Sequence, residues 1–166
     1  MIGPRAAGFA TALAVLIIDQ VTKWAIMGPI GLASRGPIDL LPVFRLIWVE
    51  NRGVSMGLLV AGSEAERWAL TAVTAAIAIG VFVWLFREKS RIDALALGAI
   101  LGGAIGNIAD RVRLGYVADF LNLHFGAWSP FLVFNVADAA ISVGVVLLAV
   151  RALFVRDASP SEKANV

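Results

Sequence analysis

The chain has 166 residues, of which 60% are hydrophobic, and it carries a formal net charge of +2. Soluble domains contain about 45–50% apolar residues, so this composition, with a mean hydropathy of +0.85, indicates an integral membrane protein. The lack of cysteine excludes disulfides, thiol catalysis and thiolate metal sites. Because His124 is the single histidine, a histidine-rich metal site is excluded as well. The basic residues are dispersed along the chain, which does not favour nucleic-acid binding.

The first apolar stretch covers about residues 6–27 and carries Asp19 and Lys23 near its end. Because these side chains are four positions apart, a helix places them on one face, and we expect a structural ion pair rather than a catalytic one. A secretory signal peptide is the alternative interpretation of this stretch. No convincing small-residue cleavage site follows it, and an aspartate within the apolar run argues against that alternative.

A long outside loop, residues 28–67, follows the first stretch. Its segment 37–50 is rich in β-branched and aromatic residues and contains two prolines, which favours short edge-type strands. Segment 55–61 is predicted to form a short amphipathic helix that lies on the membrane surface. The loop is therefore expected to be a small extramembrane structure.

Three further apolar stretches lie at about residues 68–86, 94–109 and 131–150. Helix-start signals precede them at Ser63-Glu64-Ala65-Glu66, Ser90-Arg91-Ile92-Asp93 and Ser129-Pro130. About 20 helical residues cover a hydrocarbon core of ~30 Å, so the stretch at 94–109 is marginal in length. Small residues recur in it at a spacing that permits close helix packing, at Gly98, Gly102, Gly103 and Gly106.

These stretches predict an all-α membrane protein with four transmembrane helices in one domain over residues 1–166, a second outside loop at 110–130 and a disordered tail at 157–166. Basic residues are densest on one side of such a chain, at Arg5, Arg87, Lys89, Arg91, Arg151 and Arg156. The positive-inside rule then places both termini in the cytoplasm.

Two aspartates stand in apolar surroundings, Asp119 in the second outside loop and Asp138 about seven residues into the last helix. An ionised aspartate at the bilayer centre costs roughly 2.5–3.5 kcal/mol, so it usually has a partner or a task. Asp138 shares a helix face with Asn135 and can either join two helices by hydrogen bonds or take part in chemistry. Asp119 can likewise be a solvated loop residue. If the loop folds onto the bundle, the two carboxyls would share one proton, an arrangement that activates water and protonates a leaving amine.

Further polar residues lie at the end of the third stretch, at Asn107, Asp110 and Arg111. Asp110 is expected to form a local ion pair at the level of the lipid headgroups. The planar guanidinium of Arg111 suits oxygen ligands, either a lipid phosphate or a substrate carbonyl.

In combination these residues resemble the motifs of the bacterial lipoprotein signal peptidases, the signal peptidase II family. The matching segments are Asp19-Gln20-Val21-Thr22-Lys23, Asn51-Arg52-Gly53-Val54-Ser55-Met56-Gly57, Gly102-Gly103-Ala104-Ile105-Gly106-Asn107 with Asp110-Arg111, Val117-Ala118-Asp119-Phe120, and Phe134-Asn135-Val136-Ala137-Asp138 with Ala140-Ile141-Ser142. They stand in the family's order and cover the chain from about Asp19 to Gly144. Val54, Ser55 and Met56 depart from the family's usual residues, which affects local packing and not the two aspartates.

The resemblance implies a fold with a small β cradle and a short interfacial helix beside the four-helix bundle. It implies an aspartic endopeptidase of the bacterial inner membrane, acting near the outer face without cofactor or metal. The substrate would be a diacylglyceryl-modified prolipoprotein, cut on the amino side of the lipidated cysteine. By the same resemblance the catalytic pair is Asp119 and Asp138; the residues that line the site or support it are Asn51, Asn107, Arg111, Asn135, Asp19, Lys23 and Asp110. The expected partners are prolipoproteins and membrane lipids, no nucleic acid is expected, and the enzyme is expected to act as a monomer.

Two other classes are compatible with intramembrane polar residues. A small proton-coupled transporter could use Asp19, Asp138, Asn107 and Asn135 as a relay, but the acidic groups cluster toward one membrane face and no internal repeat is visible. A non-catalytic lipid- or peptide-binding protein would retain its function after either catalytic aspartate is changed to asparagine.

Overall fold

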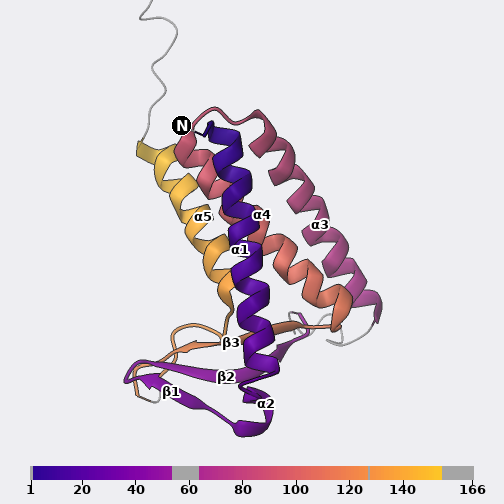
Figure 1. The fold of residues 1–166 in the computed structure, drawn as a ribbon, viewed down its shortest axis with the longest axis vertical. Coiled ribbons are helices and arrows are strands. Elements are labelled where there is room, and N and C mark those ends of the chain that lie inside the picture. The colour runs from indigo at the N-terminus through magenta and orange to yellow at the C-terminus, as the bar shows by residue number, and fades with distance from the viewer. Residues whose placement is uncertain (1, 54–63, 127, 155–166) are drawn as a thin grey trace, which may run out of the picture.

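The computed structural model describes residues 2–53, 64–126 and 128–154. Its elements are α1 (Pro4–Met27), α2 (Leu32–Arg35), β1 (Ile38–Leu41), β2 (Phe44–Asn51), α3 (Glu64–Arg87), α4 (Arg91–Arg113), β3 (Val117–Leu123) and α5 (Val136–Phe154). The four long helices form a bundle, and the strands cross one end of it, while the N-terminus, the α3–α4 turn and the end of α5 lie at the other end (Figure 1). The predicted helix at 55–61, the capping residue Ser63 and the tail at 157–166 lie outside the described residues.

All four long helices are long and apolar enough to cross a membrane, which confirms the predicted class of a four-span, mainly helical membrane protein. The third span is not marginal, because α4 has 23 residues. Ser90 starts it as predicted, since its hydroxyl accepts a hydrogen bond from the backbone N–H of Asp93 at 3.4 Å. The helix continues through Asp110 because this carboxylate is buried with a cationic partner on α1.

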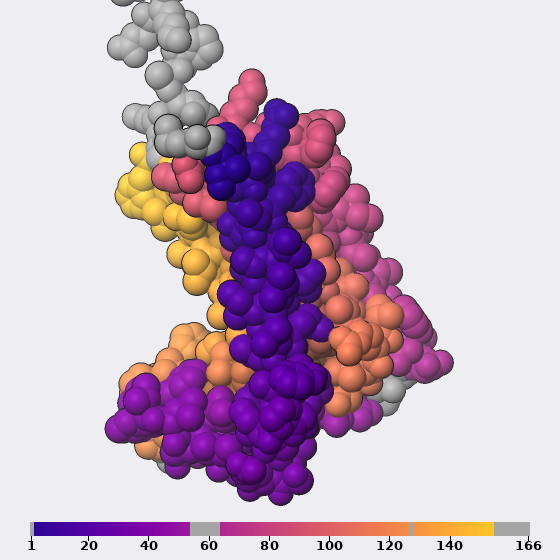
Figure 2. All heavy atoms as spheres, in the orientation of Figure 1, coloured from indigo at the N-terminus to yellow at the C-terminus, as the bar shows by residue number. Residues whose placement is uncertain are grey.

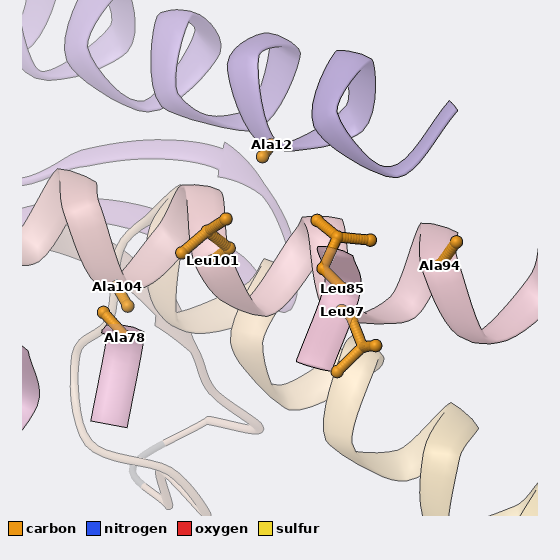
Figure 3. Close-up of a cluster of buried hydrophobic side chains, with 7 residues drawn as sticks. All are labelled: Ala12, Ala78, Leu85, Ala94, Leu97, Leu101 and Ala104. Atoms are coloured by element: carbon orange, nitrogen blue, oxygen red, sulfur yellow. The ribbon is translucent and has the colours of Figure 1, made fainter. Parts of the chain in front are cut away.

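Helix α4 is the central element of the bundle. In its most apolar window 61% of the residues are buried, against 22%, 17% and 11% in α1, α3 and α5. Small and leucine side chains of α1, α3 and α4 form the apolar core between them (Figure 3). The glycines of α4 let the neighbouring helices approach closely, as their spacing predicted. A Cβ on Gly103 would lie 2.5 Å from the carbonyl oxygen of Ala137 on α5, and a Cβ on Gly98 would overlap the backbone of Gly8 on α1.

The prediction of strands at 37–50 is confirmed by β1 and β2, and β3 adds a third strand to an antiparallel sheet of order β1-β2-β3. Of the two predicted strands, only β1 is an edge strand as expected, because β2 pairs on both sides and is the centre of the sheet. Asp119 therefore lies in a strand, not in a loop, directly opposite Val49 of β2. The sheet packs on the end of the bundle through a small apolar cluster of Ile26, Leu32, Leu46 and Phe120. This packing holds β3 at the boundary between the bundle and the sheet.

The last helix begins at Val136 and not near residue 131, so Ser129-Pro130 is not its start. The residues before it pair with the sheet instead: the N–H of Phe134 donates to Leu121 at 2.9 Å, and the N–H of Leu121 donates to Phe134 at 2.7 Å. Strand pairing satisfies these backbone groups as well as a helix would. Asp138 consequently lies in the first turn of α5, at the sheet end of the bundle, and not seven residues deep.

Candidate active site

Asp119 and Asp138 are brought together by the return of the chain from β3 to α5. Because Phe134 pairs with Leu121, the next residue, Asn135, lies beside Asp119. The side-chain amide of Asn135 donates to Asp119 Oδ1 at 2.7 Å, and the backbone N–H of Asn135 donates to Asp138 Oδ2 at 3.2 Å. One residue therefore binds both carboxyl groups, and the pair predicted from the sequence shares one site.

The start of α5 is a capping box built around Asp138. Asn135 Oδ1 accepts a hydrogen bond from the N–H of Asp138 at 2.9 Å, while Asp138 Oδ2 accepts one from the N–H of Asn135. Such reciprocal bonds satisfy backbone donors that a helix start leaves free. The Asp138 side chain is thereby fixed in the turn that also carries the amide contacting Asp119.

Each carboxyl receives a second amide donor from another element. Asn51, at the end of β2, donates to Asp119 Oδ2 at 2.9 Å, and Asn107 of α4 donates to Asp138 Oδ1 at 2.8 Å. Asn135 also donates to Asn107 Oδ1 at 3.2 Å, which joins the two halves of the site. The side chains of Asn51, Asn107 and Asn135 thus all contact the carboxyls of the candidate pair directly.

Lys23 is the hub of a buried polar network beneath the pair. Its ammonium group lies 2.9 Å from Asp19 and 2.7 Å from Asp110, and it donates to Asn107 Oδ1 at 3.1 Å. The side chain is 1% exposed, so these three contacts replace its hydration. The predicted pair of Asp19 and Lys23 is confirmed, but Asp110 pairs with α1 inside the protein and not locally at the headgroups.

The two carboxylates that bind Lys23 also hold the backbone next to the candidate catalytic residues. Asp19 Oδ1 accepts from the N–H of Ala137 at 3.0 Å, and Asp110 Oδ2 accepts from the N–H of Ala118 at 3.1 Å. Each bond anchors the residue immediately before one of the candidate catalytic aspartates. The network therefore sets the positions of β3 and α5 relative to one another.

Two residues complete this part of the structure. Arg111 is half-buried on α4, near enough to Asp138, Asp119 and Asp110 to interact with their charges, and within the described residues it forms no ion pair. Gln20 was not singled out from the sequence, yet its amide donates to Asp110 Oδ1 at 3.1 Å, and its carbonyl accepts from Arg113 at 3.1 Å. The sequence feature that could have identified Gln20 is its polar side chain within the apolar stretch of residues 6–27.

Asp119 opens onto a cleft and is nevertheless poorly hydrated. The cleft has a volume of about 530 Å³ and is lined by Val49, Glu50, Asn51, Arg52, Gly53, Asp119, Leu132 and Val133. Asp119 itself is 1% exposed. Burial raises the pKa of Asp119 from 3.8 to about 6; the Asn51 hydrogen bond opposes this rise, and the nearby charge of Asp138 adds to it. A carboxyl with this pKa can exchange a proton near neutral pH.

Among the residues that the structure describes, no group of three or more histidine, cysteine, aspartate or glutamate side chains has the arrangement to hold a metal ion. Two carboxyls, their amide donors and a guanidinium suit general acid–base catalysis on a polarised carbonyl.

The four spans define a multi-pass membrane protein, and a pair of hydrogen-bonded carboxyls lies where these spans meet a small sheet. The model of the family described as signal peptidase (SPase) II matches residues 11–154. The chain belongs to this family, which confirms the resemblance seen in the motifs and favours a peptidase over a transporter or a binding protein.

Similar proteins extend over nearly the whole chain. The lipoprotein signal peptidase of Rhizorhabdus wittichii is 62% identical over 153 residues, covering 92% of this chain and 89% of that protein. That of Sphingopyxis alaskensis is 46% identical over 160 residues, covering 93% and 92%. A solved bacterial membrane enzyme superposes with a TM-score of 0.78 at 25% identity, over 91% of this chain and 95% of that one.

Proposed function

We propose that this protein is an aspartic endopeptidase that removes the signal peptide from diacylglyceryl-modified prolipoproteins, cutting on the amino side of the lipidated cysteine. Asp119 and Asp138 are its catalytic residues. The observation that carries the proposal is the bridging of both carboxyls by Asn135 beside a cleft at one end of the spans. Membership of the signal peptidase II family supplies the substrate class.

The reaction begins with water bound between the two carboxyls. One carboxyl holds the shared proton, and the other is the general base that takes a proton from the attacking water; burial, which raises the pKa of Asp119 to about 6, favours Asp119 as the acid. Asp119 hydrogen-bonds the scissile carbonyl as negative charge develops on its oxygen. One proton then passes to the departing amine, so the peptide bond breaks without a covalent intermediate.

The amide donors have a separate task. Asn51 and Asn135 hold the two oxygens of Asp119, and Asn107 holds Asp138, so the carboxyls need no reorganisation when the substrate arrives. Arg111, close to both carboxyls, interacts with the substrate carbonyl or with the phosphate of a lipid.

The position of the site suits a lipid-anchored substrate. A signal helix and two acyl chains lie in the bilayer, so a site at the ends of the spans receives the scissile bond without extracting the substrate. The surface is hollowed between α5 and the sheet on this side of the molecule (Figure 2). In our proposal the enzyme is a monomer of the inner membrane, with cytoplasmic termini and the sheet end at the outer face.

The proposed function is tested by incubating purified protein in detergent with a prolipoprotein that carries diacylglycerol, and with the same precursor lacking it. We expect one cut before the lipidated cysteine in the modified precursor and none in the unmodified one, identified by the mass of the product. Equal cleavage of both precursors, or a cut elsewhere, would contradict the proposed substrate class.

The dependence of cleavage on pH tests the role of Asp119. Because the active pair needs one proton, kcat/KM is expected to fall as the pH rises through about 6, where Asp119 loses its proton. Asn51→Ala removes a hydrogen bond that lowers the pKa of Asp119, so it should move this descending limb to higher pH. The control is Asn122→Ala, which changes an amide side chain on β3, the strand that carries Asp119, and it should leave the pH dependence unchanged. If the fall of kcat/KM with pH occurs at the same pH in Asn51→Ala as in the wild type, the group that titrates is not Asp119.

A further inference from the structure

A second cavity lies at the end of the bundle opposite the sheet, between the start of α1 and the α3–α4 turn. These two segments are neighbours at the top of the bundle in Figure 1. The cavity has a volume of about 500 Å³ and is lined by Gly3, Pro4, Arg5, Ala6, Glu88 and Lys89. None of these residues belongs to the network around Lys23, so the proposed peptidase activity does not account for the cavity.

The side chains that line this cavity carry two positive charges and one negative charge. Arg5 and Lys89 line it and form no ion pair there. The carboxylate of Glu88 is engaged elsewhere: it accepts from the backbone N–H groups of Lys89 at 2.8 Å and Ser90 at 2.7 Å, and from the indole of Trp84 at 3.2 Å. Arg5 and Lys89 therefore line the cavity as cations, while the carboxylate of Glu88 is hydrogen-bonded to the backbone of the α3–α4 turn.

Apolar side chains surround these cations on the outside of the bundle. Trp84, Phe86 and Ile92 are all exposed, and the Arg5 guanidinium lies 5.9 Å from the centre of the Phe86 ring. Exposed tryptophan beside basic residues is typical of the boundary between lipid and water. Anions at that boundary are the phosphates of lipid headgroups.

The helices that carry the cavity residues are close-packed next to the cavity. One turn further along α1, a Cβ on Gly8 would lie 2.6 Å from the carbonyl oxygen of Ala94. Leu85 and Ala94, at the α3–α4 corner, are both 0% exposed. This packing fixes the position of the start of α1 relative to the α3–α4 turn, and so places Arg5 and Lys89 on the same cavity.

We propose that this cavity binds the headgroup of one anionic phospholipid. The lipid phosphate lies between Arg5 and Lys89, and the acyl chains follow the exposed apolar side chains beside the turn. Charge-assisted hydrogen bonds from a guanidinium and an ammonium group suit a phosphate, and basic pockets at the ends of spanning helices recognise anionic headgroups. The inference goes beyond the proposed function, because the cavity and the aspartate pair lie at opposite ends of the bundle.

The test uses the purified full chain in detergent, titrated with phosphatidylglycerol or with phosphatidylcholine, and bound lipids are counted by native mass spectrometry. We expect one phosphatidylglycerol to bind in preference to phosphatidylcholine. The double variant Arg5→Gln/Lys89→Gln should lower the affinity for phosphatidylglycerol about 25-fold, at about fivefold for each cation. Its prolipoprotein cleavage in detergent should be unchanged.

The matched control is Arg87→Gln/Arg91→Gln, which removes the same charge at the same end of the bundle but outside the cavity. It should change the affinity less than about threefold, because Arg87 and Arg91 do not line the cavity and act on a bound phosphate only through solvent, where salt screens them. Thermal unfolding checks the fold of each variant, and the single variants Arg5→Gln and Lys89→Gln replace the double one if that does not fold. The proposal would be overturned if both lipids bound equally or if the control variant lost as much affinity as the double variant. Full displacement of phosphatidylglycerol by millimolar inorganic phosphate would also overturn it and would indicate a free-phosphate site.

Discussion

Asp119→Asn and Asp138→Asn are each expected to reduce prolipoprotein cleavage about 10²–10⁴-fold, because each removes one half of the acid–base pair. Residues that act as a unit give non-additive losses, so the double variant should be no less active than the worse single variant. Asp138→Glu should also be inactive, since it keeps the charge but moves the carboxyl away from Asn107 and from the N–H of Asn135. Initial rates on the lipidated precursor measure these effects.

The control for this series is Asp39→Asn, which changes an aspartate on β1 whose side chain is 71% exposed and pairs with Arg45. It should cleave at the wild-type rate. Thermal unfolding in detergent distinguishes lost chemistry from lost structure. Normal cleavage by a folded Asp119→Asn or Asp138→Asn variant would exclude that residue from the catalytic pair.

Lys23→Met is expected to destabilise the protein by about 3–5 kcal/mol, because removing one partner of a buried ion pair leaves an uncompensated buried charge. Here two carboxylates, Asp19 and Asp110, would be left without their cation. The effect should appear as a lower free energy of unfolding in detergent–denaturant titrations. Cleavage should fall as well, since these carboxylates anchor the residues preceding the catalytic pair.

Two comparisons make this prediction specific. Arg45→Met breaks the exposed pair with Asp39 and should cost less than about 1 kcal/mol. The triple variant Lys23→Met/Asp19→Asn/Asp110→Asn removes all three charges and should recover much of the stability lost in Lys23→Met. If Lys23→Met is no less stable than Arg45→Met, the buried network does not hold the site.

Hydropathy and local signals were sufficient to predict the four spans and the strands at 37–50, because they depend on residues that are close along the chain. The start of α5 was not predictable in this way. Residues 129–134 are as compatible with a helix as with an extended segment, and the pairing of Phe134 with Leu121 decides between the two. The depth assigned to Asp138 depended on that start, and so it was wrong.

The sequence by itself determined which residues matter: polar side chains are costly in apolar spans, so Asp19, Lys23, Asn107 and Asp138 had to be paired or functional. Only the tertiary structure decided which partner each one takes. Asp19 and the N–H of Ala137 are 118 residues apart in the chain, and Gln20 and Asp110 are 90 apart. Hydrogen bonds and ion pairs act over about 3 Å, so the partner is fixed by how α1, α4, α5 and β3 pack and not by the order of residues along the chain.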